Sequence, residues 1–458
     1  MQIFKNFFEL HDECLLLLYM KKVIIIGAGV AGISAAIEIC QSGHEVELLE
    51  QKAQIGGRIY SLEDKASGDL IDNGQHLLTG AYLRFLKILE ILGTDDKIKK
   101  QKSLAIDFYT KNGITSLDTS KLPGSLGMLY GLLALKNIKF SSKLAAISLA
   151  VKLKAGGEGN ADEDCYTFLK RHNQGDDLIT LFWEPLILAT INAEMKIAPS
   201  ILLVNVLKKA FFADRKSAVL MFPTKDLNHL LEPLGEFLAM HNSKLRLSAK
   251  VEKLNIVDNV CTGITLSNGE IIEADAVIIA VPPYSLQKLL PANSPIAEFT
   301  SKMNYSPIIS VYFWFEQDLF DFDFAGIVGY HSQWVFNRRR LIDVDSPKYV
   351  GHITVTVSAA ESLMKMSLDE IAELVFEEIR EIFKLGKEIR YIRHKVIIEK
   401  FATPLFTCEN EKQRPSESTD IERLFIAGDW CNTGLPATIE GAAISGLNAA
   451  KLTKKALD

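Results

Sequence analysis

The feature that most constrains this chain is a strand, a glycine-rich turn, a helix and a second strand that follow one another near its start. In KKVIIIGAGVAGISAAIEICQSGHEVELLE, the β-branched residues 23–26 predict a buried strand, and the apolar spacing over 30–40 predicts a helix. Residues 46–49 are apolar again and predict the second strand. Strands joined by a crossover helix pair in parallel, so the stretch predicts an α/β fold with a parallel sheet.

The turn carries three spaced glycines, Gly27, Gly29 and Gly32, and Glu50 closes the second strand. The first glycine allows the tight turn, the second lets backbone N–H groups approach a pyrophosphate, and the third lets the helix pack on the strand. Free amides at the helix start then hold the phosphates, and Glu50 accepts hydrogen bonds from the adenosine ribose. A purely structural turn explains each glycine separately but leaves Glu50 unexplained. The set therefore predicts a dinucleotide site.

A second glycine loop, Gly56-Gly57-Arg58, follows the second strand and favours FAD over NAD. Its paired glycines bring the backbone close to the cofactor again, and Arg58 offers a fixed cation to the pyrophosphate or the flavin. NAD dehydrogenases do not need this loop. The alternative, an arginine in a surface turn, gives the paired glycines no role.

The stretch IDNGQHLLTG at 71–80 combines a polar cluster with an apolar one. An acid at Asp72, two amides and an imidazole at His76 run directly into Leu77 and Leu78. A strand exposed on one face would alternate, and an ordinary loop would not carry the leucines. From these residues alone, a hydrogen-bonded core histidine is the default interpretation of His76.

The C-terminal stretch LFIAGDWCNTGLPATIEGAAISG predicts a strand to Gly428-Asp429, a turn, and a helix of small residues from about Ala437. Asp429 can accept hydrogen bonds from ribityl hydroxyls. The helix near Thr438 directs free N–H groups and a positive dipole at the flavin. A carboxylate that caps the turn is the structural alternative for Asp429, and it is compatible with the same role.

The stretch FWEPLIL predicts a helix start with Pro185 in the first turn. Glu184 is then either a capping acid or an acid that faces a pocket. The sequence alone favours capping, because acids are common in the first turn of helices.

Three stretches carry a resemblance to a known family: IDNGQHLLTGAY at 71–82, FWEPLILATIN at 182–192 and GDWCNTGLPATIEGAAISG at 428–446. With them, the chain resembles the GDI-like, amine-oxidase-type flavoproteins. Within that superfamily it is similar to the hydroxysqualene dehydroxylases, which are squalene-associated FAD-dependent desaturases. The first two stretches distinguish this branch from the plant-type phytoene desaturases. The resemblance covers 20–458.

The resemblance implies an α/β fold, with a GDI-like Rossmann FAD-binding domain interleaved with an α+β substrate domain. The expected segments are an N-terminal extension at 1–19, an FAD-binding domain at 20–90, 215–290 and 418–458, and a substrate-binding domain at 91–214 and 291–417. We expect 91–214 to be mostly helical, since its apolar residues recur at helical spacing between polar hinges.

The resemblance also implies roles for single residues. The 71–82 stretch is expected to pass the flavin ring, with leucines that wall a channel for an isoprenoid. Its His76, with Glu184 or Asp72 behind it, is the expected general acid. The implied FAD contacts are Gly27, Gly29, Gly32, Glu50, Gly57, Arg58, Gln75, Val251, Gly428, Asp429, Thr438 and Ile439.

The implied activity is reductive dehydroxylation of hydroxysqualene to squalene in hopanoid or triterpenoid biosynthesis. The alternatives are a carotenoid desaturase of the phytoene type, another amine-oxidase-like FAD oxidoreductase, and a non-catalytic GDI-like isoprenoid carrier. The GGR loop and the Gly428-Asp429 turn disfavour the carrier. The sequence carries one strand-borne GxGxxG, so we expect an external electron donor.

Composition excludes several other classes. A net charge of −6 without a basic tract disfavours nucleic acid as a partner. The six cysteines are scattered without a CxxC pair, which favours free thiols in a reducing compartment and disfavours a metal site.

Targeting features predict a cytoplasmic protein. Residues 1–19 have a short apolar core and no small-residue cleavage site, unlike a signal peptide. The longest other apolar run, at 122–135, is too short to span a bilayer and suits a buried or interfacial helix. Lysines follow at 136, 139, 143, 152 and 154. We therefore expect peripheral contact with the inner face of the cytoplasmic membrane, although packing inside the substrate domain explains these helices nearly as well.

Overall fold

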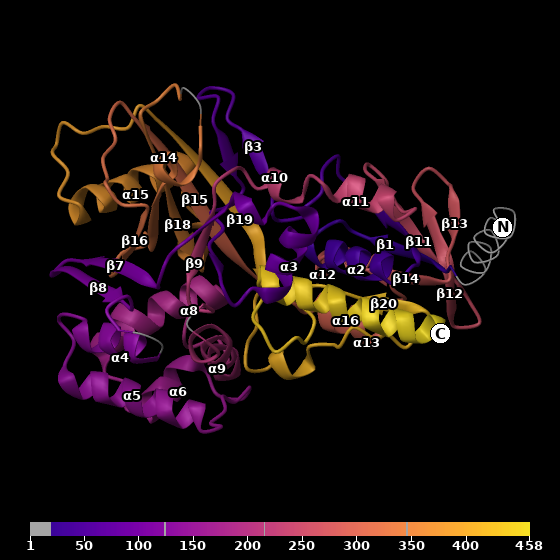
Figure 1. Cartoon of the computed structure of the whole chain (residues 1–458), viewed down its shortest axis with the longest axis horizontal. Helices are drawn as coiled ribbons and strands as arrows, with labels where there is room; N and C mark the ends of the chain where they lie inside the picture. Colours follow the sequence, from indigo (N-terminus) through magenta and orange to yellow (C-terminus); the bar gives the residue numbers. More distant parts are fainter. Residues whose placement is uncertain (1–19, 123–124, 215, 345–346) are drawn as a thin grey trace, which may run out of the picture.

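The computed structural model describes residues 20–122, 125–214, 216–344 and 347–458. The predicted extension at 1–19 lies outside these residues. Figure 1 shows two sheet-based parts, one built around a parallel sheet and the other around a large mixed sheet with helices along its side. The chain crosses between the parts several times, as the predicted α/β fold with interleaved domains requires.

The five-stranded parallel sheet has the order β10-β2-β1-β14-β20 within the described residues. Its strands are β1 (Lys22–Ile26), β2 (Glu45–Leu49), β10 (Lys244–Arg246), β14 (Ala276–Ile279) and β20 (Leu424–Ile426). Apart from the partly exposed edge strand β10, the strands are short, mostly apolar and largely buried because helices and loops cover both faces. All of them fall in segments expected to bind FAD.

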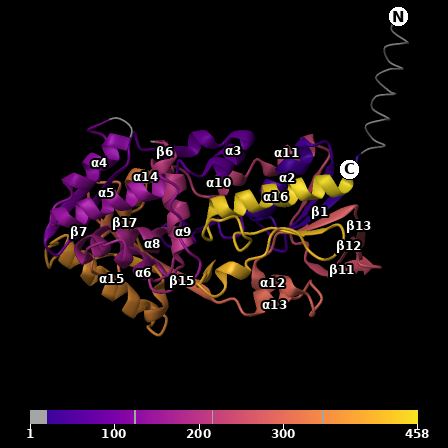
Figure 2. The same ribbon diagram turned by 90° about the horizontal axis from the view of Figure 1, so that it is seen from below.

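Two helices from opposite ends of the chain pack closely beside this sheet (Figures 1 and 2). They are α2 (Val30–Gln41) and α16 (Ile439–Leu457). Gly446 permits the approach, since a Cβ there would lie 2.0 Å from the carbonyl oxygen of Ala31. The Ser34 hydroxyl also donates a 2.6 Å hydrogen bond to the carbonyl of Ala443. The small residues of the C-terminal motif therefore serve helix packing.

A three-stranded antiparallel sheet extends the nucleotide-binding part. It contains β11 (Val251–Val257), β12 (Val260–Leu266) and β13 (Ile271–Glu273). Gly269 has a φ of +88° in the turn between the last two strands. Asn-Gly is a common hairpin turn because both residues tolerate positive φ.

The second part is built on a seven-stranded sheet with the order β19-β15-β18-β17-β16-β7-β8 among the described residues. Its strands are β7 (Ala105–Thr110), β8 (Gly113–Asp118), β15 (Tyr305–Phe315), β16 (Phe324–Ile327), β17 (Trp334–Asn337), β18 (Gly351–Ser358) and β19 (Arg393–Pro404). Helix α15 (Leu368–Ile382) begins with a capping box between Ser367 and Glu370 and packs Phe376 against Phe313 of the sheet.

The prediction that 91–214 is mostly helical is wrong for its first third. Strands β6 (Ile98–Lys100), β7 and β8 occupy that region, and β7 joins the large sheet through a parallel pairing with β16. The hairpin turns at Lys111-Asn112, and Gly113, which opens β8, has a φ of +111°. Helices follow from α4 (Ser125–Ala134) and α5 (Phe140–Lys154) to α9 (Ser200–Val206).

Pro185 lies in the first turn of α8, as the sequence predicts, but α8 continues a longer helical stretch. The stretch runs through α7 (Asp176–Leu178), a π-helical segment at Ile179–Trp183 and α8 (Glu184–Ile191). A wider π turn before Pro185 accommodates a residue that has no N–H to donate. The predicted helix start at FWEPLIL is therefore confirmed for α8, although helical structure of another type precedes it. In the described part of the chain, no helix is long and apolar enough to cross a bilayer.

Candidate functional site

A cavity of about 850 Å³ is lined by residues of both parts of the molecule. Its lining includes the glycine turn after β1, the 56–58 loop, the 73–77 loop and the turn before α16. It continues to side chains of β7, β8 and α8 in the second part. One space therefore joins the predicted cofactor residues to the predicted substrate domain.

The first glycine turn has two glycines that the protein itself requires. Gly27 has a φ of +103°, and a Cβ there would lie 2.6 Å from the carbonyl oxygen of Ala280. A Cβ on Gly32 would lie 1.9 Å from the carbonyl oxygen of Gly27. Gly29 differs, because its Cβ would meet no protein atom closer than 3.9 Å although the residue lines the cavity. The free space at Gly29 is the space that a bound pyrophosphate needs.

Glu50 follows β2 and lines the cavity with its carboxylate almost fully buried. One oxygen accepts from the Ala28 N–H at 3.0 Å, and the other accepts from the Lys52 N–H at 2.9 Å. Each carboxylate oxygen keeps a lone pair for a ribose hydroxyl. Glu50 thus supports the first glycine turn and faces the adenosine side of the predicted site.

The GGR loop is fixed against the first turn and against the C-terminal motif. Gly57 has a φ of +64°, and a Cβ there would lie 3.2 Å from the Cα of Gly29. Arg58 donates to the Asp429 carboxylate at 2.8 Å and to the Ala402 carbonyl at 2.7 Å. Burial alone would lower the pKa of Arg58, but Asp429 raises it above its ordinary value. Arg58 is therefore a fixed cation on the cavity lining.

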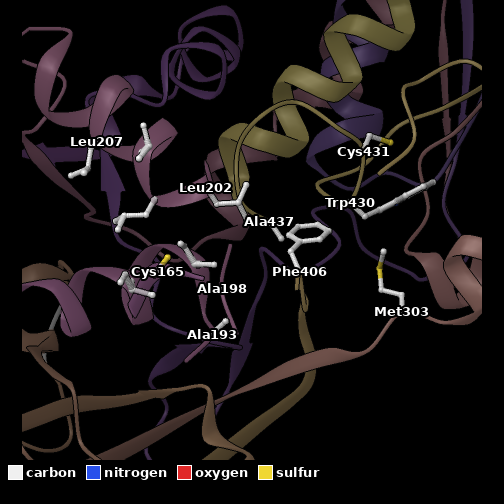
Figure 3. Close-up of a cluster of buried hydrophobic side chains, with 14 of the residues drawn as sticks. Cys165, Ala193, Ala198, Leu202, Leu207, Met303, Phe406, Trp430, Cys431 and Ala437 are labelled. Carbon is white, nitrogen blue, oxygen red and sulfur yellow. The ribbon is translucent and has the colours of Figure 1, made fainter. Parts of the chain in front are cut away.

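The turn before α16 presents a helix N-terminus to the same cavity. Thr438 caps the helix by accepting from the Gly441 N–H at 3.1 Å, and both Thr438 and Ile439 line the cavity. The preceding loop belongs to a buried cluster in which Trp430 and Cys431 lie close to Phe406 (Figure 3). Burial raises the pKa of the Cys431 thiol, which makes it a packed side chain and not a thiolate.

The 71–82 stretch divides its side chains between the cavity and the protein interior. Gln75, His76 and Leu77 line the cavity. The His76 Nδ1 is 2.7 Å from the Gly74 carbonyl oxygen, and a carbonyl only accepts, so Nδ1 carries the proton. Burial lowers the pKa of His76, while the Asp72 carboxylate opposes that shift. The imidazole is therefore neutral at pH 7, with Nε2 unprotonated.

Asp72, predicted as a catalytic acid, does not line the cavity. Its carboxylate accepts from Arg338 at 2.6 Å and from the Ser61 hydroxyl at 2.5 Å, and both charged side chains are almost fully buried. Arg338 also donates to the Gln75 amide oxygen at 3.1 Å. Asp72 therefore fixes the loop from the side away from the cavity, as an acceptor paired with Arg338.

Glu184, the other predicted acid, is also absent from the cavity lining, although Pro185 and Leu186 after it are part of it. It neither caps a helix nor points into the site, since the helical stretch begins earlier. Burial and the nearby Glu194 carboxylate raise its pKa. The structure therefore brings His76, but neither predicted carboxylic acid, to the cavity.

An apolar wall forms a further part of the lining. Two of its aromatic rings, Phe108 and Trp334, lie 6.1 Å apart in a tilted pair. The apolar side chains of this wall are Leu104, Ile106, Phe108, Leu117, Phe182, Leu186, Phe211, Leu220, Trp334 and Phe336. Such a wall accepts a hydrocarbon and excludes water.

Two residues at the site escaped prediction from the sequence. Asn192 ends α8 at a φ of +55°, donates to Thr403 and accepts from the Ala359 N–H, which ties the helix to the large sheet. Its position at the end of the FWEPLILATIN stretch, with asparagine favoured at a left-handed C-terminus, was the available signal. Arg414 is fully buried and donates to carbonyls of the loop before α16, which no local pattern indicates.

Comparison with known proteins identifies the family. A model described as flavin containing amine oxidoreductase matches residues 30–453, which is most of the chain. The chain belongs to this flavin-dependent family. It is an FAD-dependent oxidoreductase, and the turns around Gly29, Arg58 and Asp429 fit that cofactor. No group of His, Cys, Asp and Glu in the described ranges could hold a metal ion.

Individual relatives narrow the comparison. A hydroxysqualene dehydroxylase of Zymomonas mobilis is 26% identical over 93% of this chain and 98% of its own length. A chloroplastic 15-cis-phytoene desaturase of Narcissus pseudonarcissus is 25% identical over 93% of this chain and 78% of its own. An oxidoreductase from Methanosarcina mazei shares the fold, with a TM-score of 0.72 at 16% identity over 94% of this chain and 100% of its own. The predicted fold class and cofactor are confirmed.

Proposed function

We propose that the protein reductively removes the allylic hydroxyl of hydroxysqualene to give squalene. The observation that carries the proposal is the single cavity, which joins the FAD turns to an apolar wall and has His76 on its lining. Relatives named hydroxysqualene dehydroxylase match over nearly the whole chain, which supports this substrate class. We expect an external electron donor to reduce the flavin.

The reaction replaces a C–O bond with a C–H bond. Reduced FAD supplies the hydride when it is bound, and one proton must reach the leaving hydroxyl so that it departs as water. Protonation of the leaving group is a task for a positioned general acid. The protein must also orient the allylic carbon and exclude water, which the apolar wall does.

Two titratable side chains of the 71–82 stretch line the cavity, His76 and Tyr82. Burial raises the pKa of Tyr82 further above neutral pH, so His76 is the better candidate acid. Its Nδ1–H is committed to the Gly74 carbonyl, so the proton for the hydroxyl must come from Nε2. Because burial lowers the pKa, Nε2 holds that proton only in the minor imidazolium form at pH 7. An imidazolium of lowered pKa is a stronger acid, so the minor form transfers its proton readily.

A desaturase of the phytoene type is the second candidate. The phytoene desaturases that match over 93% of this chain favour it. The same cavity suits either redox direction, since both reactions need an isoprenoid beside the flavin. A non-catalytic carrier is disfavoured, because the Gly27, Gly57 and Asp429 turns would then serve no group.

A product assay tests the proposal against its rival. The FAD-loaded protein, reduced under anaerobic conditions, is given hydroxysqualene, and squalene is measured by gas chromatography with mass detection. In parallel, the oxidised protein is given phytoene with an electron acceptor. We expect squalene in the first reaction and unchanged phytoene in the second. Desaturated phytoene without squalene would replace the proposal with the second candidate.

A further inference from the structure

The outward face of α4 is apolar along its whole length. Leu126, Leu129, Tyr130 and Leu133 are 55%, 36%, 42% and 38% exposed. Their spacing of three and four residues places them on one side of the helix. Surface helices of globular proteins normally turn such a stripe inward and leave charged residues outside. Here Met128 and Leu132, on the other side, pack into the core instead.

The neighbouring helix α5 also exposes large apolar side chains. On α5, Phe140 is 68% exposed, Leu144 49% and Val151 62%. Figures 1 and 2 show α4 and α5 next to each other at the outer edge of the molecule, away from the parallel sheet. We call these side chains the α4–α5 face; its members are Leu126, Leu129, Tyr130, Leu133, Phe140, Leu144 and Val151. A large exposed apolar patch marks an interaction site.

Exposed lysines border this face. Lys136 and Lys139 lie between the two helices, and Lys152 lies in the last turn of α5. Within the described residues, none of these three forms an ion pair, so their charges remain available. Lys143 differs from the expectation drawn from the sequence. Its ammonium donates to the carbonyls of Leu133 and Leu135 at 2.6 Å each and so caps α4.

Helix α4 and strand β8 separate the face from the cavity. Gly131, on the inner side of the helix, brings α4 close to β8: a Cβ on Gly131 would lie 3.1 Å from the Cδ1 of Leu117. Leu117 in turn lines the apolar part of the cavity. The exposed apolar surface and the apolar end of the site therefore lie on opposite sides of the layer that α4 forms with β8.

We propose that the α4–α5 face docks on an anionic lipid bilayer. Its leucines and aromatic rings enter the boundary between headgroups and acyl chains, and the lysines contact the headgroup phosphates. Docking in this orientation turns the apolar end of the cavity toward the hydrocarbon. This last step, delivery of an isoprenoid from the bilayer, rests on the proposed function; the docking itself does not.

The lysines favour a bilayer over a second copy of the chain. A two-fold contact through this face would bring the lysines of both copies together without acids in the face to neutralise them. Protein interfaces are also depleted in lysine. An anionic lipid surface accepts the apolar side chains and the cations together.

Flotation of the FAD-loaded protein with vesicles tests the docking without substrate. We expect binding to phosphatidylcholine vesicles that contain phosphatidylglycerol, and weaker binding to phosphatidylcholine alone. The double variant Leu129→Ser/Leu133→Ser should bind at least about tenfold more weakly, because it removes two side chains that bury apolar surface. Lys136→Glu/Lys139→Glu should abolish the preference for anionic vesicles.

The matched control is Val257→Ser/Ile271→Ser, which changes two aliphatic residues that are 58% and 68% exposed on the other part of the molecule. It should float like the wild type. Wild-type protein that stays in the pellet with anionic vesicles overturns the proposal. A wild-type dimer in solution that the leucine variant converts to a monomer also overturns it, by assigning the face to a second copy.

Substrate in detergent micelles separates this inference from the proposed function. Micelles deliver hydroxysqualene without a bilayer, so turnover there reports on the chemistry alone. The leucine variant should keep its micellar turnover and lose turnover of vesicle-borne substrate about tenfold. Flotation without any dehydroxylation would leave the docking intact and reject the function.

Discussion

At the scale of single residues, His76 combines a fixed tautomer with a lowered pKa. The Gly74 carbonyl fixes the proton on Nδ1, and burial disfavours the imidazolium that a general acid requires. The negative charge of Asp72 partly offsets the lowering of the His76 pKa by burial. The rate of a reaction that needs this acid must therefore follow the small protonated fraction.

We expect turnover of hydroxysqualene to rise as pH falls below 6.5. The acid form of His76 is populated below its pKa, and that pKa lies below the ordinary value of 6.5. Turnover by His76→Ala and His76→Gln should fall about a hundredfold, which is the usual rate contribution of a general acid. Both variants should also lose the increase in turnover at low pH. The measurement is a pH–rate profile with the flavin content of each variant as control. Loss of flavin would make His76 a cofactor ligand instead.

Two glycines of the first turn can be compared by substitution: Gly29 has free space beside it for a cofactor, whereas Gly32 is packed against the backbone. Gly29→Ala should leave the thermal unfolding of the apoprotein unchanged, since the added methyl meets no protein atom within 3.9 Å. It should weaken FAD binding tenfold or more, because the methyl occupies the pyrophosphate space. Gly32→Ala should destabilise the apoprotein itself by about 2 kcal/mol, as overpacking does. Equal FAD affinity in Gly29→Ala and wild type would show that the phosphates lie elsewhere.

At the scale of elements, the buried Arg414 makes several contacts with the loop between β20 and α16. Arg414 donates to the carbonyls of Leu435 at 2.8 Å and Cys431 at 2.5 Å. Its guanidinium also lies 4.0 Å above the Phe406 ring. Together with the Arg58–Asp429 pair, these contacts hold the loop and the N-terminus of α16 in position.

Arg414→Lys should therefore weaken FAD binding as well as the fold. Lysine keeps the charge but cannot contact several carbonyls in one plane. We expect unfolding to become easier by about 3 kcal/mol, because buried carbonyls lose their donors. Flavin fluorescence should appear at a lower temperature than global unfolding. The control is Arg423→Lys, whose side chain is 44% exposed. A variant that loses stability but releases flavin only on global unfolding would limit Arg414 to a purely structural role.

The elements also show where the sequence was informative. The parallel strands and the Asn268-Gly269 hairpin were predictable, because their apolar runs and turn residues are local signals. The β7–β8 hairpin was missed although Asn112-Gly113 carries the same signal; polar side chains on its exposed edge weaken the alternation. The π-helical turn before Pro185 has no local signature and depends on tertiary packing.

At the scale of the whole molecule, the site is assembled by contacts between distant segments. Arg58 joins Asp429 to β19, and Arg338 joins Asp72 and Gln75 to the large sheet. Gly29, Glu50, Arg58 and His76 were predicted and lie together on the cavity. Asp72 and Glu184 were grouped with them but lie outside it, since sequence position does not reveal which way a side chain points. Arg338, the partner of Asp72, lies too far along the chain for any local pattern to indicate the pairing.

Since the residues predicted to contact FAD come from distant segments of the chain and line one cavity, removal of FAD should loosen both parts together. We expect the cofactor to be non-covalent, so acid precipitation should release the yellow colour into the supernatant. A ligand that binds only the folded state stabilises it, by about 2.7 kcal/mol at a hundred times its Kd. The apoprotein should therefore unfold at a lower temperature, and added FAD should restore the transition in a concentration-dependent way. Because FMN lacks the adenosine that Glu50 is placed to hold, FMN at equal concentration should restore less. Colour that remains in the pellet would show a covalent flavin, and equal rescue by FMN would remove Glu50 from the site.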